Sequence, residues 1–143
     1  MFVASVSVIA ADPPASRRLF VDALGLPLHR YDGGGDYWSS EEVAGTRHFG
    51  VWPLTEAAQA CFGSPEWPAD RAVPQVSLEF EVESRGEVAT TAAELEAQGH
   101  ALVHQARTEP WGQTVARLLS IDGAVVGVSF APWMHGQAGP PVA

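Results

Sequence analysis

The sequence has only one cysteine and few positive charges, and both shortages exclude classes of protein. A lone thiol, Cys61, excludes an intramolecular disulfide and gives no cysteine spacing for zinc. Its neighbours are apolar, so we expect a packed and unreactive side chain. All eight cationic residues are arginine, against 17 acidic residues, and the net charge is −9. Nucleic-acid binding needs a basic surface, so this balance argues against a nucleic-acid partner.

Long apolar runs and a basic N-terminus are missing as well. No uncharged apolar stretch approaches the roughly 20 residues that cross a bilayer, so we expect no membrane contact. The opening MFVASVSVIAAD lacks the basic start of a signal peptide and alternates apolar with polar residues, which indicates a strand. We therefore expect a cytoplasmic protein. At 143 residues it is most simply a single domain with a hydrophobic core.

The strongest organisational signal is an approximate repeat. Each half reads as a strand, a helix and three further strands. A helix cap is expected at Asp12 and again, 72 residues later, at Ser84. A glycine typical of a helix end follows at Gly25 and, 74 residues later, at Gly99. Because one βαβββ unit cannot bury its sheet alone, the two copies are expected to pair.

The repeat predicts an α+β fold of two tandem βαβββ units, residues 1–53 and 75–133. Residues 54–74 join the units and contain a short helix near residues 55–62, and residues 134–143 are expected to form a flexible tail.

Alternation in the first strand of each unit predicts which side chains share a face. The apolar residues of these strands are expected to pack under the helices, namely Val6, Val8, Val76, Leu78, Phe80 and Val82. The polar residues between them point the other way, toward water if the sheet is flat and into a cavity if it curls. These residues are Ser5, Ser7, Ser77, Glu79 and Glu81.

Three segments occur in order along this repeat, namely AADPPASRRLFVDALGLPL, VSLEFEVES and EPWGQTVARLLSIDG. On a visible duplication that covers roughly residues 3–133, they resemble the vicinal oxygen chelate superfamily. This superfamily includes glyoxalase I, extradiol dioxygenases and bleomycin-resistance proteins. The resemblance implies that the two units curl into an open barrel with a concave ligand cleft. It also implies a homodimer whose clefts are formed by both chains.

The resemblance further implies where metal-dependent members would hold their ion. The corresponding positions fall at Ser5, Ser77 and Gly127, with a fourth near residues 50–52. Serine and glycine are poor ligands for a divalent transition metal. We therefore expect no metal, no other cofactor and no catalytic residue. A metal site that includes His48 is the alternative.

Five tryptophans are many for a chain of 143 residues, and most fall at strand ends or in loops, where ligand groups are often displayed. Trp111 in TEPWGQ stands 73 residues after Trp38, so both halves are expected to bring an indole to a comparable position. We expect Trp38, Trp52 and Trp111 to form stacking walls for a ligand. Trp133 is expected to close the fold or to contact a partner chain. The further ligand-binding candidates are Tyr37, Phe49, Trp67, His48, Glu109, Gln113, Arg117, Ser5, Ser7, Ser77 and Glu79.

The leading functional prediction is a metal-free protein that sequesters a flat aromatic natural product or antibiotic, as the metal-free resistance proteins of the superfamily do. This prediction rests on two observations: the expected metal-ligand positions lack usable donors, and the chain has many aromatic residues. Two alternatives stay open. One is an enzyme of the same fold, of the lyase or dioxygenase type, which uses either a metal or Glu79, Glu81 or Arg117. The other is a small interaction module whose aromatic residues form a dimer interface.

Overall fold

The computed structural model describes residues 1–137, and its strands form one mixed sheet of eight. The sheet order is β2-β3-β4-β1-β5-β8-β7-β6, and the two outermost strands, β2 and β6, do not pair with each other. The elements of the first unit are β1 (Phe2–Ala10), α1 (Pro13–Arg17) with its π-helical continuation Arg18–Ala23, β2 (His29–Arg30), β3 (Trp38–Ser40) and β4 (His48–Pro53). After α2 (Leu54–Phe62), the second unit contains β5 (Val76–Glu81), α3 (Arg85–Ala97), β6 (Leu102–Thr108), β7 (Thr114–Leu119) and β8 (Val125–Phe130).

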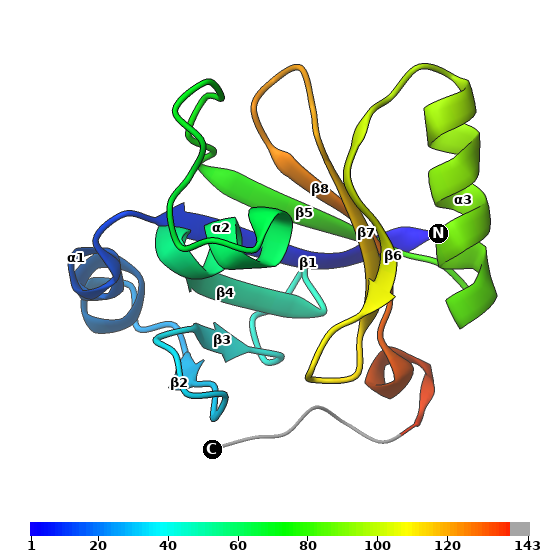
Figure 1. Cartoon of the computed structure of the whole chain (residues 1–143). Helices are drawn as coiled ribbons and strands as arrows, with labels where there is room; N and C mark the ends of the chain where they lie inside the picture. Colours follow the sequence, from blue (N-terminus) through cyan, green and yellow to red (C-terminus); the bar gives the residue numbers. More distant parts are fainter. Residues whose placement is uncertain (138–143) are drawn as a thin grey trace.

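The predicted repeat is visible in how the strands pair. Within each unit the first and last strands are parallel, β1 with β4 and β5 with β8, and the last strand pairs antiparallel with the one before it. The units meet where β1 pairs antiparallel with β5, with Ser7 opposite Ser77. Figure 1 shows these two strands crossing the middle of the molecule. The α+β fold of two βαβββ units is thus confirmed, as a curved sheet that does not close into a barrel.

Local signals in the sequence account for the helix boundaries. The Asp12 carboxylate accepts a hydrogen bond of 3.1 Å from the backbone N–H of Ala15, and the Ser84 hydroxyl accepts one of 3.3 Å from that of Glu87. Each side chain thereby satisfies an N–H that the first helical turn leaves free. Gly25 and Gly99 have φ angles of 72° and 94°, a region that favours glycine, so both helices end where predicted.

Other boundaries differ from the predictions. The second strand of the first unit is very short, since β2 comprises only His29–Arg30. Pro27 has no N–H for a ladder, and β2 lies at the edge of the sheet. The expected tail begins later than residue 134, because a 3-10 helix spans Pro132–His135. Residues 138–143 lie outside the described residues.

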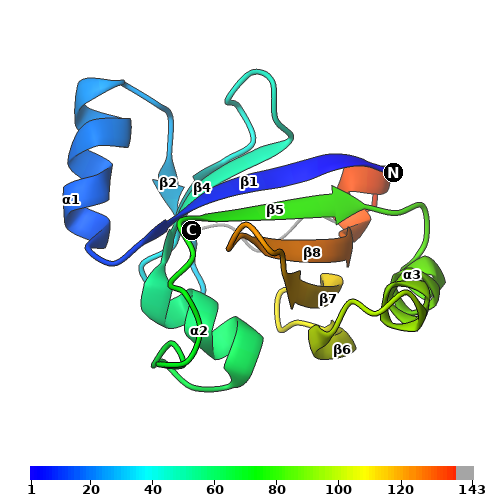
Figure 2. The same ribbon diagram turned by 90° about the horizontal axis from the view of Figure 1, so that it is seen from above.

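The two faces of the sheet are covered differently. Three core clusters form, around α3, around α2, and around the helical segment that begins at Pro13. Strand alternation places the first and third of these on one face, with α2 on the other, as Figure 2 shows from above. Cys61 is buried in the α2 cluster, where burial raises the pKa of its thiol, which agrees with an unreactive cysteine. No helix of residues 1–137 is long and apolar enough to cross a membrane.

The helices do not cover the middle of the outer face. Val6, Val8, Val76 and Leu78 lie there side by side, each only partly buried, and none belongs to a core cluster. The prediction that this face packs under helices is therefore wrong for these four residues and for Phe80, and right for Val82, which packs in the cluster of α3. The helices cover only the ends of this face, where Ala10 and Val82 are buried.

Candidate functional site

A cleft of about 790 Å³ opens on the inner face of the curved sheet. Ser5, Ser7 and Glu79 line it, so three of the five polar residues that were predicted to share this face do line a cavity, while Ser77 and Glu81 are not among its lining residues. The volume lies within the usual range for small-molecule sites. Five aromatic side chains besides histidine contribute to the lining: Tyr31, Tyr37, Trp52, Trp111 and Trp133.

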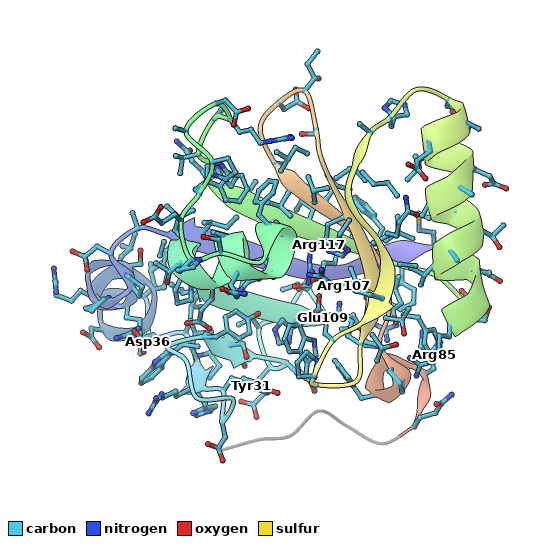
Figure 3. The ribbon with its side chains drawn as sticks, viewed as in Figure 1. Tyr31, Asp36, Arg85, Arg107, Glu109 and Arg117 are labelled. Atoms are coloured by element: carbon cyan, nitrogen blue, oxygen red, sulfur yellow. The ribbon has the colours of Figure 1, made fainter. Side chains whose placement is uncertain are left out.

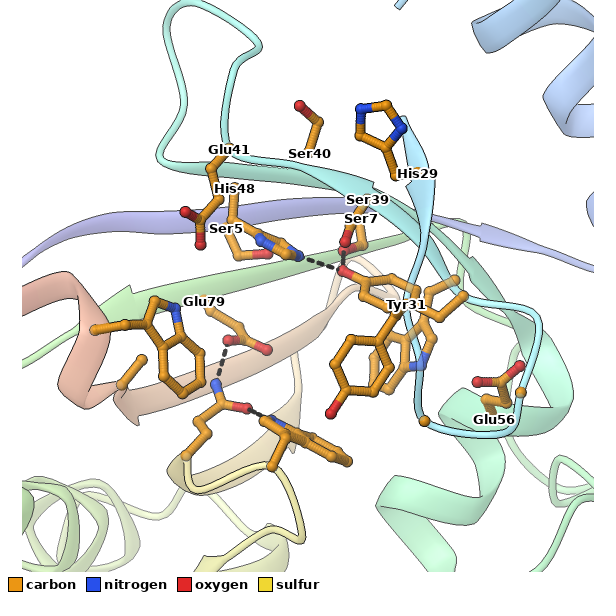
Figure 4. Close-up of a pocket in the computed structure, with 18 of the residues that line it drawn as sticks. Ser5, Ser7, His29, Tyr31, Ser39, Ser40, Glu41, His48, Glu56 and Glu79 are labelled. Carbon is orange, nitrogen blue, oxygen red and sulfur yellow. Dashed lines mark hydrogen bonds between the residues drawn. The ribbon is translucent and has the colours of Figure 1, made fainter. Parts of the chain in front are cut away.

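On one side of the cleft, Tyr37 and His48 form a short hydrogen bond. The Tyr37 Oη atom is 2.6 Å from His48 Nε2 and 3.4 Å from the Ser7 hydroxyl (Figure 4). Burial raises the pKa of the Tyr37 phenol and lowers the pKa of His48 to about 4. Both groups are therefore neutral at pH 7, so the phenol donates and the imidazole Nε2 accepts.

On the other side, one amide holds three partners in place. Gln113 Nε2 donates to Glu79 Oε2 at 2.5 Å and to Ser129 Oγ at 2.8 Å. Its Oε1 accepts from Trp111 Nε1 at 2.8 Å. Burial raises the pKa of the Glu79 carboxyl, opposed by the Arg117 charge and the Gln113 hydrogen bond, while Glu81 and Glu109 add to the rise. The indole N–H of Trp111 is satisfied within the protein, so this residue offers the cleft its ring.

One arginine of the cleft lining is buried and forms an ion pair. Arg117 is 1% exposed, and its Nη1 donates to Glu109 Oε1 at 2.8 Å and to His104 Nε2 at 3.1 Å. Figure 3 shows Arg117 beside Arg107 and Glu109 in the middle of the molecule. Arg107 also contacts Glu109, at 3.3 Å, and donates to the Ala60 carbonyl at the end of α2. The guanidinium carbon of Arg117 lies 5.6 Å from the centre of the Trp52 ring, which is cation–π geometry.

The positions where the resemblance implies metal ligands do not fit a divalent transition metal. The register equates Gly50 of β4 with Gly127 of β8, because Ser7 pairs with Gly50 and Glu79 with Gly127 in the two units. A side chain at Gly50 would collide with the Tyr37 phenol, and a Cβ at Gly127 would lie 3.1 Å from Glu79 Cγ. The space beside both glycines is thus already filled. Within residues 1–137, no three His, Cys, Asp or Glu side chains gather as a metal site.

Nine of the fourteen predicted binding residues line the cleft and five do not. The nine are Ser5, Ser7, Tyr37, His48, Trp52, Glu79, Trp111, Gln113 and Arg117. Glu109 is buried behind Arg117, and Ser77 is buried within the sheet. Trp67 packs on Phe62 in the α2 cluster, with its N–H donated to the Ala72 carbonyl.

Trp38 and Phe49 need correction because they belong to the opposite face. Both pack in the cluster beneath the first helical segment, where Arg17 lies 4.9 Å from the Trp38 ring. Successive strand residues point to opposite faces, so Tyr37 takes the place in the cleft that was expected for Trp38. The proposed equivalence of Trp38 and Trp111 also fails. The registers of β3 with β4 and of β7 with β8 equate Trp38 with Ala116.

The sequence did not predict several lining residues. They are His29, Arg30, Tyr31, Gly33, Gly35, Ser39, Ser40, Glu41, Glu42, Glu56, Pro110, Ala131, Trp133 and Met134. Most come from the β2–β3 segment or from the 3-10 helix after β8, which fold over the cleft. For Tyr31 and Trp133, the sequence offered one indirect indication of a place in the cleft, because both are large aromatic residues next to turns.

The packing of Tyr37 against Gly50 gives a first prediction. Gly50→Ala should lower the free energy of unfolding by about 1 to 3 kcal/mol, because the added methyl displaces the phenol from His48. Gly86→Ala is the matched control: nothing lies within 4 Å of a Cβ there, and α3 should become slightly more stable. Urea unfolding measures both, and equal stability of the two variants would contradict the prediction.

The neutral state of His48 gives a second prediction. Its pKa is lower in the folded protein than in the unfolded chain, so its contribution to stability is full above about pH 6.5 and is lost as the pH falls toward 4. Between pH 7 and 4, wild type should lose about 2 to 3 kcal/mol more than His48→Gln. The exposed His100→Gln should follow wild type. Parallel pH profiles of wild type and His48→Gln would refute the assignment.

No family model matches the sequence, and no curated protein matches it. Among solved structures, the chain is similar to a glyoxalase/bleomycin resistance protein/dioxygenase superfamily member from Vibrio splendidus 12B01, with 15% identity, a TM-score of 0.57, and coverage of 90% of this chain and 97% of that one.

Two further structures extend the likeness. Methylmalonyl-CoA epimerase from Mycobacterium tuberculosis has 17% identity and a TM-score of 0.58, covering 94% of this chain and 91% of that one. The Mn(II)-bound glyoxalase from Novosphingobium aromaticivorans has 13% identity and a TM-score of 0.56, over 90% of this chain and 37% of that one. At such identities the likeness is one of fold. The chain therefore has the vicinal oxygen chelate fold, that of the glyoxalase/bleomycin resistance protein/dioxygenase superfamily.

Proposed function

We propose that this chain is a metal-free binding protein that sequesters a flat aromatic compound, such as a natural product or antibiotic, in the cleft of its sheet. The observation that carries the proposal is the lining. Five tyrosine and tryptophan side chains surround a cavity large enough for a drug-sized molecule. Trp111 supports it further, because the Gln113 hydrogen bond fixes the orientation of an indole that has no other polar task.

The donor set of the cleft supports the metal-free part of the proposal. Serine and glycine occupy the positions where metal ligands were expected. The Tyr37 and Glu79 side chains fill the space beside the glycines. Serine hydroxyls, a neutral phenol and one carboxyl are a weak set for a divalent transition metal. Aromatic contact and hydrogen bonding then supply the binding energy.

Titration of planar aromatic compounds, followed by tryptophan fluorescence and calorimetry, tests the proposal. Trp111→Leu should weaken binding about threefold to tenfold, because it removes the ring but keeps an apolar side chain. Trp67→Phe, outside the cleft, should leave the affinity as in wild type. Absence of binding across a broad panel would refute the proposal, as would a loss of affinity in Trp67→Phe alone.

A second candidate function is proton-transfer catalysis on the bound compound. The specific observation is that Glu79, with its raised pKa, lines the same cleft as the hydrogen-bonded Tyr37 and His48. A carboxyl group and a second titratable group in one cleft can act as general base and general acid. Solved structures of similar fold include proteins named as an epimerase and a glyoxalase. Recovery of the compound unchanged, with no deuterium taken up from D₂O, would favour sequestration; conversion or exchange would favour catalysis.

We also propose that the protein is a homodimer. The partly buried strip of Val6, Val8, Val76 and Leu78 supports this, because neighbouring apolar side chains that no helix covers favour association. Replacing Val6 and Leu78 by threonine should shift the molecular mass in sedimentation equilibrium from that of a dimer toward that of one chain. A wild-type protein of 15.2 kDa at micromolar concentration would contradict the proposal.

A further inference from the structure

Two side chains that line the cleft carry a buried polar atom without a hydrogen-bond partner. Among residues 1–137, such atoms are Arg117 Nε, Trp133 Nε1 and Glu81 Oε1, and the first two belong to the cleft lining. Both are N–H donors. A buried donor without an acceptor costs about 1 to 3 kcal/mol, so an occupant that supplies acceptors gains more than one that does not.

The Arg117 guanidinium is held in a fixed orientation by its neighbours. Its hydrogen bonds to Glu109 and His104 both leave from Nη1, on one side of the planar group. His104 Nδ1 lies 2.7 Å from the Gln105 carbonyl, so this nitrogen carries the proton and Nε2 is free to accept. The Arg117 guanidinium carbon lies over the Trp52 ring, 5.6 Å from the ring centre. The edge that contains Nε is the one that can meet a carboxylate with two parallel hydrogen bonds.

The local charge also favours an anion at this point. Arg107 and Arg117 share one carboxylate, Glu109, so the three side chains together carry one net positive charge. Three further carboxylates line the cleft: Glu41 and Glu42 are exposed, where salt screens charges over about 8 Å, and the partly buried Glu56 accepts a hydrogen bond from the Asp36 N–H. The buried guanidinium is screened much less. Glu79 opposes an anion, but its raised pKa means that a proton can neutralise it when an anion enters.

We infer that the ligand is an acidic aromatic compound, whose carboxylate pairs with the Arg117 guanidinium and which carries a second acceptor oxygen for the indole N–H of Trp133. This inference rests on the proposed function and narrows it to one ligand class. The aromatic body lies among the tyrosine and tryptophan rings, and the carboxylate sets its orientation. A neutral carbonyl can accept one hydrogen bond from Arg117 but supplies neither the negative charge nor the second oxygen of a carboxylate, and a cationic group supplies no acceptor.

Calorimetry with three matched probes tests the inference: 2-naphthoate, 2-naphthamide and 2-(aminomethyl)naphthalene. The carboxylate should bind about tenfold to a hundredfold more tightly than the amide, and the amine more weakly still. Arg117→Gln should abolish the preference for the carboxylate. Arg18→Gln, which removes an exposed arginine of the first helical segment, should keep it.

Two more variants keep the test decisive if Arg117→Gln, which leaves Glu109 buried without its partner, does not fold. Arg117→Lys retains the charge without the planar pair of donors and should reduce the preference about threefold to tenfold. Trp133→Phe retains a ring without the N–H. It should lower the affinity for 3-hydroxy-2-naphthoate, which has a second acceptor oxygen, more than the affinity for 2-naphthoate.

Equal binding of the three naphthalene probes, or an unchanged preference in Arg117→Lys, would overturn the inference while the proposed function stands. Binding of other planar compounds without an acidic group, when 2-naphthoate is not bound, would also overturn it. Failure of every planar aromatic compound, whatever its charge, would refute the proposed function itself.

Discussion

The antiparallel pairing of β1 with β5 is the constraint on which the rest of the structure depends. It joins the two βαβββ units into one sheet and places Ser7 opposite Ser77 and Ser5 opposite Glu79. Because side chains alternate along a strand, this register puts the polar residues of both strands on the inner face and the valines on the outer face. A shift of one residue in either strand would exchange the two sets and remove the cleft.

Polar groups inside the cleft give the aromatic walls their positions. Tyr37 is held by His48, and Trp111 by Gln113, whose amide is in turn held by Glu79 and Ser129. Buried hydrogen bonds of this kind have low tolerance for displacement, since a lost partner leaves a buried group unsatisfied. The lining is thus arranged before any ligand arrives, which lowers the entropy lost on binding.

Most of the fold could be predicted from the sequence, because its signals are local. The caps at Asp12 and Ser84 and the helix-ending glycines depend on neighbours within a few residues, and all lie where expected. The cleft was harder, because it depends on register and loop path. Trp38 was expected as a wall of the cleft and Tyr37 only as a further candidate, whereas Tyr37 lines the cleft and Trp38 packs on the opposite face. Arg117 meets Glu109 and His104 only through the pairing of β6 with β7, which has irregular register. Trp133 reaches the cleft because a helical turn follows β8, and no periodic pattern marks that turn.

The two glycines beside Tyr37 and Glu79 restrict the order in which this cleft could change. A metal-binding side chain at Gly50 has no room until Tyr37 has been replaced, and one at Gly127 requires Glu79 to move. Each first step disturbs a hydrogen bond of the existing site before any ligand for a metal is complete. Conversion of this cleft into a metal centre therefore requires at least paired substitutions, with a less well-ordered cleft between them.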